Sequence, residues 1–287
     1  MLPPTGPERC TRCVWLVLAA AILAGCGGRQ VLMNGDDLDR GLLIVLPGID
    51  GRALHNELAS RRLSEAGLGL AVELYDWTAP LGPLFNQCAY ERNRQVAAAL
   101  AERVGAYRQE HPGGSVFLIG HSGGTAIAVW AAECLDAGER IDGVVLLASS
   151  LSPTYDLGGA LAHTRCGIVS FHSARDVALL GAGTTWFGTM DRAHGESAGK
   201  VGFRRPAAGL HQIAWRDGMA RHGHDGGHFS CLAPDFVCAY VAPLLVAKDW
   251  NEDVMTTVRR GEGRLSAAAP GDALALTGTD ATGRGGL

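Results

Sequence analysis

The chain has 287 residues, of which 47% are hydrophobic and 19% are charged, and its formal net charge is −4. This length and hydrophobic content suit one α/β domain with a full core. The slight negative charge and the lack of a basic cluster argue against nucleic acid, or an anionic membrane surface, as an electrostatic partner.

The first 25 residues predict a signal peptide, because two arginines precede an apolar segment, residues 14–23, that is too short to span a bilayer. The peptide ends in Leu23-Ala-Gly-Cys26, which resembles the lipobox of bacterial lipoproteins. That resemblance implies cleavage before Cys26, lipid chains on this residue, and an exported protein anchored to a membrane of the cell envelope. A plain signal peptide or a signal anchor is the alternative. Residues 26–40 are expected to form the lipidated cysteine and a tether.

Residues 41–249 alternate short apolar runs with helical patterns, which predicts one domain with a mostly parallel sheet and helices on both faces. About six strands are expected, at 42–46, 70–75, 116–119, 143–148, 167–172 and 212–215. Helices are expected from about 54, with Leu54, Leu58 and Leu63 facing inward, then at 90–110, at 125–135 and from Pro234. Residues 250–287 lack periodicity and predict a disordered tail.

The most informative stretch joins the strand at 116–119 to the apolar helix at 125–135 through Gly120-His-Ser-Gly-Gly124, a G-x-S-x-G pattern. A strand that turns into a helix within about one residue forces strained backbone at Ser122, and flanking glycines leave room where a Cβ would clash. The turn exposes the Ser122 hydroxyl beside the free N–H groups of the helix, as a nucleophile requires. A glycine-rich turn capped by Ser122 is the alternative. The glycine spacing fits neither a phosphate loop nor a dinucleotide-binding loop.

With this pattern, the Pro47-Gly48 loop after the first strand, and the order Ser, Asp, His along the chain, the sequence resembles the α/β-hydrolase superfamily. The resemblance covers roughly residues 42–246 and implies an α/β-hydrolase fold. The two strands that usually precede the first parallel strand have no room here, so a sheet reduced at its N-terminal side is expected.

The resemblance implies an acidic residue beyond the strand at 167–172. Asp176 stands at that position, and Asp191 is the fallback. A carboxylate there would fix the tautomer of the catalytic histidine and stabilise its imidazolium.

The histidine is expected after the last strand, where the chain offers three within a few residues. His228 is the preferred base, since it lies a few residues before the helix that begins at Pro234 and follows two glycines; His224 is the alternative. A metal site in this cluster is a further alternative, although it lacks the Cys or carboxylate set that zinc prefers.

The oxyanion hole implied by the resemblance uses the backbone N–H groups of Gly123 and Ile49. Because the family often has His-Gly where this chain has Pro47-Gly48, an ordinary glycine-rich strand exit remains the alternative for the second donor.

Two connections bear on the substrate. The usual lid site, residues 149–166, is a short Ser/Pro/Gly segment, which argues for an esterase or thioesterase rather than an interfacial lipase. The longer excursion, 177–209, is expected to form a satellite core or to line a pocket for an apolar acyl group. Its large apolar side chains are Trp186, Phe187, Met190 and Phe203.

The sequence thus predicts a lipid-anchored serine hydrolase that cleaves a carboxylic ester or thioester through an acyl-enzyme on Ser122. Its expected partners are a small-molecule or lipid acyl substrate and the membrane, and no metal or organic cofactor is expected. The alternatives are a catalytically silent, hydrolase-like binding or scaffold lipoprotein, and an acyltransferase that uses the same triad.

Cys231 and Cys238 are candidates for a disulfide.

Overall fold

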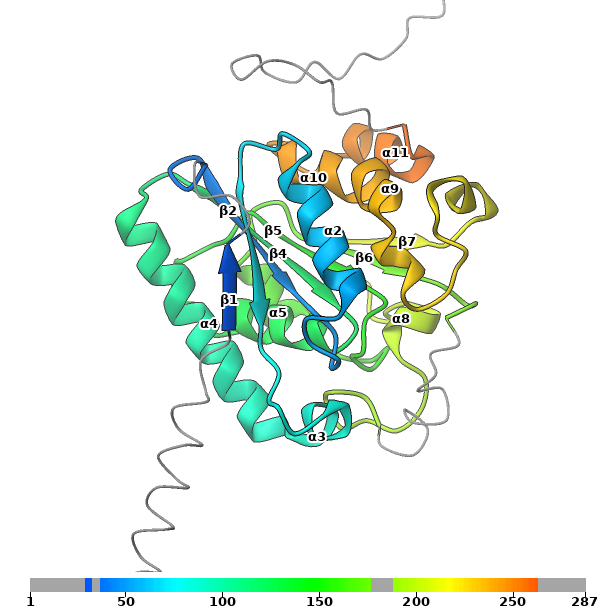
Figure 1. Ribbon diagram of the computed structural model, residues 1–287, viewed down its shortest axis with the longest axis horizontal. Helices are drawn as coiled ribbons and strands as arrows, with labels where there is room; N and C mark the ends of the chain where they lie inside the picture. Colours follow the sequence, from blue (N-terminus) through cyan, green and yellow to red (C-terminus); the bar gives the residue numbers. More distant parts are fainter. Residues whose placement is uncertain (1–28, 33–36, 177–187, 263–287) are drawn as a thin grey trace, which may run out of the picture.

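The computed structural model describes residues 29–32, 37–176 and 188–262 (Figure 1). These residues form one seven-stranded sheet with the strand order β1-β3-β2-β4-β5-β6-β7. β1 pairs antiparallel with β3, and the other neighbouring pairs are parallel. The strands are β1 (Arg29–Leu32), β2 (Gly41–Leu46), β3 (Ala71–Asp76), β4 (Ser115–His121), β5 (Gly143–Leu147), β6 (Ile168–His172) and β7 (Leu210–Ala214).

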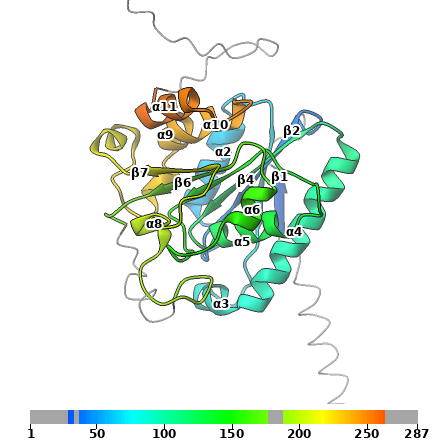
Figure 2. The ribbon, with the colours of Figure 1, turned by 180° about the vertical axis from the view of Figure 1, so that it is seen from behind.

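Helices cover both faces of this sheet, so the domain has three layers (Figure 1, Figure 2). The long helices α4 and α5 lie on one face, whereas α2 and the last helices of the described chain lie on the other. The strand order and the two helical layers confirm the predicted α/β-hydrolase fold class. The helical segments are α2 (Leu54–Ser64), α3 (Pro83–Cys88), α4 (Tyr90–Glu110), α5 (Gly123–Glu133), α6 (Gly158–Ala162), α8 (Ala198–Val201), η1 (Asp217–His222), η2 (Ser230–Leu232), α9 (Pro234–Phe236), η3 (Val237–Val241), α10 (Ala242–Val246) and α11 (Glu252–Arg260).

The unbroken apolar run of β2 follows from its place between two helical layers. Leu42, Ile44 and Leu46 point into the core beneath α4 and α5, and the alternate residues Leu43 and Val45 point into the core beneath α2. All five side chains are buried. A strand inside such a sheet therefore needs apolar residues on both faces.

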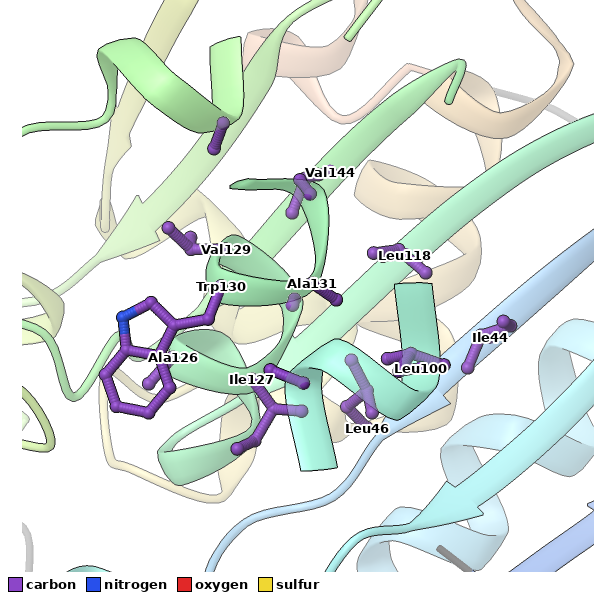
Figure 3. Close-up of a cluster of buried hydrophobic side chains, with 14 of the residues drawn as sticks. Ile44, Leu46, Leu100, Leu118, Ala126, Ile127, Val129, Trp130, Ala131 and Val144 are labelled. Atoms are coloured by element: carbon purple, nitrogen blue, oxygen red, sulfur yellow. The ribbon is translucent and has the colours of Figure 1, made fainter. Parts of the chain in front are cut away.

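The core beneath α4 and α5 holds α5 firmly on the sheet (Figure 3). Leu100 of α4 and the residues Ile127 and Trp130 of α5 are fully buried in this core, with Ile44 and Leu118 of the strands. Because α5 is apolar on nearly its whole circumference, it fits a position enclosed on every side. The first residue after β4, at the start of α5, is thus fixed in space.

The prediction that three leucines of α2 face inward is wrong for two of them. Leu54 is 71% exposed and Leu58 is 44% exposed, whereas Leu63 is buried as predicted. The buried face instead includes the small side chains of Ala59 and Ser60, which let the helix approach the last helices closely. The leucine pattern therefore marks an apolar outer surface at the beginning of this helix.

The expected disordered tail begins too early. Trp250 is 4% exposed and its ring lies over Gly143, where a Cβ would come within 2.4 Å of it. Asn251 then caps α11 by accepting a hydrogen bond from Val254 N. The sequence carries a signal for this helix, namely the capping residue followed by apolar residues at helical spacing, but the segment is short. The buried residues of α11 are Val254, Met255 and Val258.

The tether expected over residues 26–40 is partly a strand, since β1 supplies one antiparallel strand ahead of the first parallel one. The N-terminal side of the sheet is consequently less reduced than predicted. Residues 1–25 and Cys26 lie outside the described residues. Among the helices that the structure describes, none has the length and apolar character needed to cross a membrane.

Candidate active site

Ser122 lies at the sharp turn between β4 and α5, with φ 49° and ψ −121°. This left-handed conformation is strained for a residue with a side chain. The turn is possible only because the neighbouring backbones approach very closely. A Cβ on Gly120 would lie 2.6 Å from Gly124 O, and one on Gly124 would lie 2.3 Å from Leu46 O. The strand-to-helix turn and the need for both glycines agree with the prediction.

The structure brings Ser122, His228 and Asp176 into one chain of contacts. His228 Nε2 lies 2.9 Å from Ser122 Oγ, and His228 Nδ1 lies 3.0 Å from each carboxylate oxygen of Asp176. A carboxylate can only accept, so Nδ1 carries the ring proton and Nε2 is left to accept from the serine hydroxyl. Asp176 and Ser122 are buried, and the side chain of His228, which joins them, is only 11% exposed.

Three strands set this geometry. Ser122 directly follows β4, Asp176 follows β6 by a turn in which its N–H donates to Ser173 O, and His228 follows β7. The carboxyl ends of parallel strands meet at one edge of a sheet, so residues 106 positions apart in sequence come within hydrogen-bond distance.

The two alternative residues lie elsewhere. His224 is buried, its Nδ1 lies 2.8 Å from Ser230 Oγ, and its ring packs edge-on against Phe236. Burial lowers the pKa of His224 to about 4, so the ring is neutral. Asp191 accepts hydrogen bonds from the N–H and hydroxyl groups of Ser152. Each therefore has a structural contact in place of one with Ser122.

The two expected oxyanion donors lie side by side. A Cβ on Gly123 would lie 3.4 Å from Ile49 N, which places the loop after β2 directly against the start of α5. Within the described part of the chain, neither N–H has a hydrogen-bond acceptor. Both groups are thus available to an oxygen atom placed next to Ser122.

Two side chains that sequence reasoning missed hold this loop in place. Trp77 Nε1 donates to Pro47 O at 2.7 Å, and Asn86 Nδ2 donates to Ile49 O at 3.0 Å. Asn86 is buried, and its own carbonyl accepts a 2.7 Å hydrogen bond from Asn93 Nδ2. A buried asparagine pair in α3 and α4 is a weak sequence signal, because its partner atoms are backbone groups far away in the chain.

His121, the variable residue of the G-x-S-x-G pattern, also contacts the base. It is fully buried, and its Nε2 lies 3.1 Å from His228 O, so the Nε2–H donates to that carbonyl. Burial, with a smaller contribution from His228, lowers the pKa of His121 to about 3 and keeps the ring neutral. Cys231 Sγ donates to the same carbonyl at 3.2 Å, and so it is a free thiol with no bridge to Cys238.

An exposed aromatic ring, Phe229, lies next to the histidine that contacts Ser122. Phe229 packs against His228 with ring centroids 5.1 Å apart and against His55 at 4.6 Å. His55 Nε2 lies 3.0 Å from a carboxylate oxygen of Asp50, at the end of the loop after β2. The surface next to His228 therefore combines an exposed phenyl ring with one acid–imidazole pair.

The longer excursion contributes to the main core rather than to a satellite core. Met190 and Phe203 are buried in the cluster beneath α4 and α5. Trp186 and Phe187 lie outside the described residues. Among residues 29–32, 37–176 and 188–262, no group of three or more His, Cys, Asp or Glu side chains is arranged to hold a metal ion.

No protein-family model matches the chain, and the comparison with curated proteins found no match. Several solved structures are similar in fold. The esterase Pf2001 of Pyrococcus furiosus is 11% identical with a TM-score of 0.48, over 76% of this chain and 91% of that one. XC6422 from Xanthomonas campestris, described as an α/β serine hydrolase without a lid, is 15% identical with a TM-score of 0.41, over 71% and 81%. A dienelactone hydrolase-like promiscuous phosphotriesterase, P91, from metagenomic libraries is 21% identical with a TM-score of 0.42, over 62% and 70%. Because these identities and TM-scores are low, function is inferred below from the geometry of this chain alone.

Proposed function

We propose that this protein is a serine hydrolase that cleaves a carboxylic ester or thioester through an acyl-enzyme on Ser122. The observation that carries the proposal is the contact chain from Ser122 Oγ to His228 at 2.9 Å and from His228 to Asp176 at 3.0 Å. A serine that only caps a helix does not require a contact with a histidine that a carboxylate orients.

Acylation begins when Ser122 Oγ attacks the carbonyl carbon of the substrate and its proton passes to His228 Nε2. The carbonyl oxygen becomes an oxyanion, which the N–H groups of Gly123 and Ile49 stabilise. When this intermediate collapses, the bond to the leaving group breaks and the leaving group takes the proton from His228. The acyl group then remains on Ser122.

Deacylation repeats these steps with water. His228 takes a proton from water, the hydroxyl attacks the acyl carbon, and the same N–H groups hold the second oxyanion. Ser122 leaves with the proton from His228, so the free acid is released and the enzyme is restored. Asp176 stays ionised throughout and stabilises the imidazolium formed in both halves.

The proposed place of action is the cell envelope, with lipid on Cys26 as the anchor. The lipobox-like sequence Leu23-Ala-Gly-Cys26 supports this part of the proposal. Intact mass measurement tests it, because the mature chain would begin at Cys26 and carry the added mass of its acyl chains. A mature chain that begins elsewhere, or lacks that mass, contradicts it.

Fluorophosphonate labelling tests the enzyme activity on the full chain. Wild type should be labelled covalently, while Ser122→Ala and His228→Ala should not be labelled. His224→Ala is the matched control, since His224 contacts Ser230 and not Ser122, and it should keep its labelling if folded. Circular dichroism checks the fold of each variant.

A folded wild-type protein that is not labelled, or a Ser122→Ala variant that keeps full esterase activity, would contradict the proposed activity. The first result would favour a hydrolase-like binding protein instead.

A further inference from the structure

We propose that the carboxyl edge of the sheet docks on the lipid bilayer that holds the Cys26 anchor, so that the Ser122 site opens toward esters dissolved in that bilayer. The carboxyl edge is defined here as the surface formed where β2, β3, β4, β6 and β7 end, with the beginning of α2, with α3 and with α8. The inference rests on the proposed function and on lipid at Cys26, and it adds the orientation and the substrate class.

The pairing of β1 fixes where the anchored segment meets the domain. Arg29, the first residue of β1, stands opposite Asp76, the last residue of β3. β1 runs antiparallel to β3, so its beginning lies at the carboxyl edge (Figure 1). Cys26 is three residues earlier, and three residues of extended chain span at most about 11 Å. An anchor on Cys26 must therefore hold this edge of the sheet close to the membrane.

Asp76 is itself near the active-site loop. A Cβ on Gly51 would lie 3.1 Å from Asp76 Oδ1 and 2.7 Å from Thr78 Oγ1. Gly51 closes the loop that carries Ile49, and Ile49 lies against Gly123 beside the nucleophile. The beginning of β1 and the loop that carries Ile49 are therefore neighbours at this edge of the sheet.

Exposed apolar side chains gather at the same edge. In the described part of the chain, the exposed large hydrophobic side chains all belong to segments that follow the carboxyl ends of strands. Leu54 and Leu81 are the most exposed, at 71% and 67%. The full set is Leu54 and Leu58 after β2, Leu81, Leu84 and Phe85 after β3, Val201 after β6, and Phe229 after β7.

The opposite edge of the sheet has the contrary character. A hollow there is lined by Arg108, Glu139, Arg140, Asp142 and Arg165. Burying such charges in hydrocarbon is costly, whereas transferring exposed leucines out of water is favourable. The carboxyl edge also carries exposed ion pairs, Arg175 with Asp217 and Lys200 with Glu196, but of the two edges it alone adds large exposed apolar side chains within the described residues.

This orientation adds a second membrane contact to the acyl anchor and gives the site its substrate class. An ester whose acyl chain is dissolved in the bilayer would reach Ser122 past Phe229 and His55 without first entering water. The substrate class is therefore a membrane-resident acyl ester, which the docked edge rather than a lid would bring to the site.

The two lysines of the chain provide a test that does not depend on activity. Lys200 lies on α8 at the carboxyl edge, and Lys248 is exposed at the opposite edge, where its carbonyl accepts from Cys166 before β6. The full lipidated chain in phosphatidylcholine vesicles is treated with a membrane-impermeant, amine-reactive ester, and the ratio of Lys200 to Lys248 modification is measured by mass spectrometry.

The ratio is compared between wild type, the double variant Leu54→Glu/Leu84→Glu, and Ala137→Glu. Ala137 is an exposed residue in the turn before β5, so this control adds a charge at the opposite edge. We expect the ratio to rise about tenfold in the double variant and to stay at the wild-type value in Ala137→Glu. Equal ratios in all three proteins, or an equal rise in the control, would overturn the proposed orientation.

A second readout separates this inference from the proposed activity. Wild type and Ala137→Glu should both hydrolyse a short water-soluble ester in the same vesicles. If neither does so, the proposed hydrolase activity fails while the lysine ratio still reports the orientation. If both do so and the lysine ratios are equal, the activity stands and the orientation is wrong.

Discussion

The two edges of the parallel sheet use buried polar groups in opposite ways. At the carboxyl edge, His228 contacts both Ser122 and Asp176, and the start of α5 lies against the loop that carries Ile49 N. At the amino edge, the opposite edge of the sheet, the buried Asp142 carboxylate accepts from Val116 N and pairs with the guanidinium groups of Arg108 and Arg165, which line the hollow there. The polar groups of the carboxyl edge form the candidate active site, whereas those of the amino edge pair with one another within the fold.

The direction of the backbone explains this difference. Where a parallel strand ends, the chain turns toward a helix, and the free N–H groups of the helix start point outward. Where a strand begins, the chain has just left a helix, and free carbonyl groups predominate. Polar side chains at the carboxyl edge can therefore work with N–H donors on an oxyanion. The predictions below test this division between the two edges.

The largest expected effect is on the triad. Asp176→Asn should lower kcat/KM about 10⁴-fold, because an amide no longer holds the His228 tautomer that accepts from Ser122. Asp191→Asn is the control, since Asp191 contacts Ser152 instead, and it should stay within about twofold of wild type. Equal losses in the two variants would show that the Asp176 contact has no catalytic role.

At the amino edge the effect should fall on stability alone. Asp142→Ala should lower the free energy of unfolding by up to about 3 kcal/mol, chiefly because it leaves the buried Val116 N without its acceptor, while the two arginines that lose the carboxylate stay partly exposed to water. Activity of the folded variant should be unchanged. Asp136→Ala, an exposed residue of the same edge, should change stability by less than about 0.5 kcal/mol in urea unfolding. A loss of kcat in folded Asp142→Ala would contradict the idea that the polar groups of the amino edge affect stability alone.

The oxyanion loop should show a smaller, purely catalytic effect. Asn86→Ala removes the donor to Ile49 O and should lower kcat about 10²-fold with little change in KM, because the transition-state oxygen depends on the position of that loop. The neighbouring Gln87 donates to Gly188 O instead, so Gln87→Ala is the control. A rise in KM without a change in kcat would indicate that Asn86 affects substrate binding only.

The smallest expected effect is on how the free energy of unfolding depends on pH, and it concerns buried groups of the carboxyl edge. His121 and His224, both at the carboxyl edge, have pKa values lowered to about 3 and about 4 by burial. Below about pH 6.5 these two histidines bind protons in the unfolded chain but not in the folded protein. The free energy of unfolding is therefore highest above that pH and falls as the pH drops toward 4. Each ring contributes a slope of up to about 1.4 kcal/mol per pH unit. His121→Gln should reduce the slope, measured by urea unfolding between pH 7 and pH 5. An unchanged slope would mean that His121 does not remain neutral in the folded state.

Most of the fold was predictable because its signals are local. An unbroken apolar run such as Leu42 to Leu46 specifies a strand covered on both faces, and the helix predicted at 90–110 matches α4. The failures also have local causes. The leucines of α2 follow a helical spacing but form its outer surface, and α11 depends on a capping residue and a few buried contacts.

The sequence by itself determined the strained turn at Ser122, because this residue and the glycines that permit its backbone lie within five residues of one another. Only the tertiary structure decided that His228 rather than His224 meets Ser122, and that His121 and Asn86 support the site. These contacts join positions far apart in the chain, so they depend on how strands and helices pack, and no local pattern encodes a distance of 3 Å across the sheet.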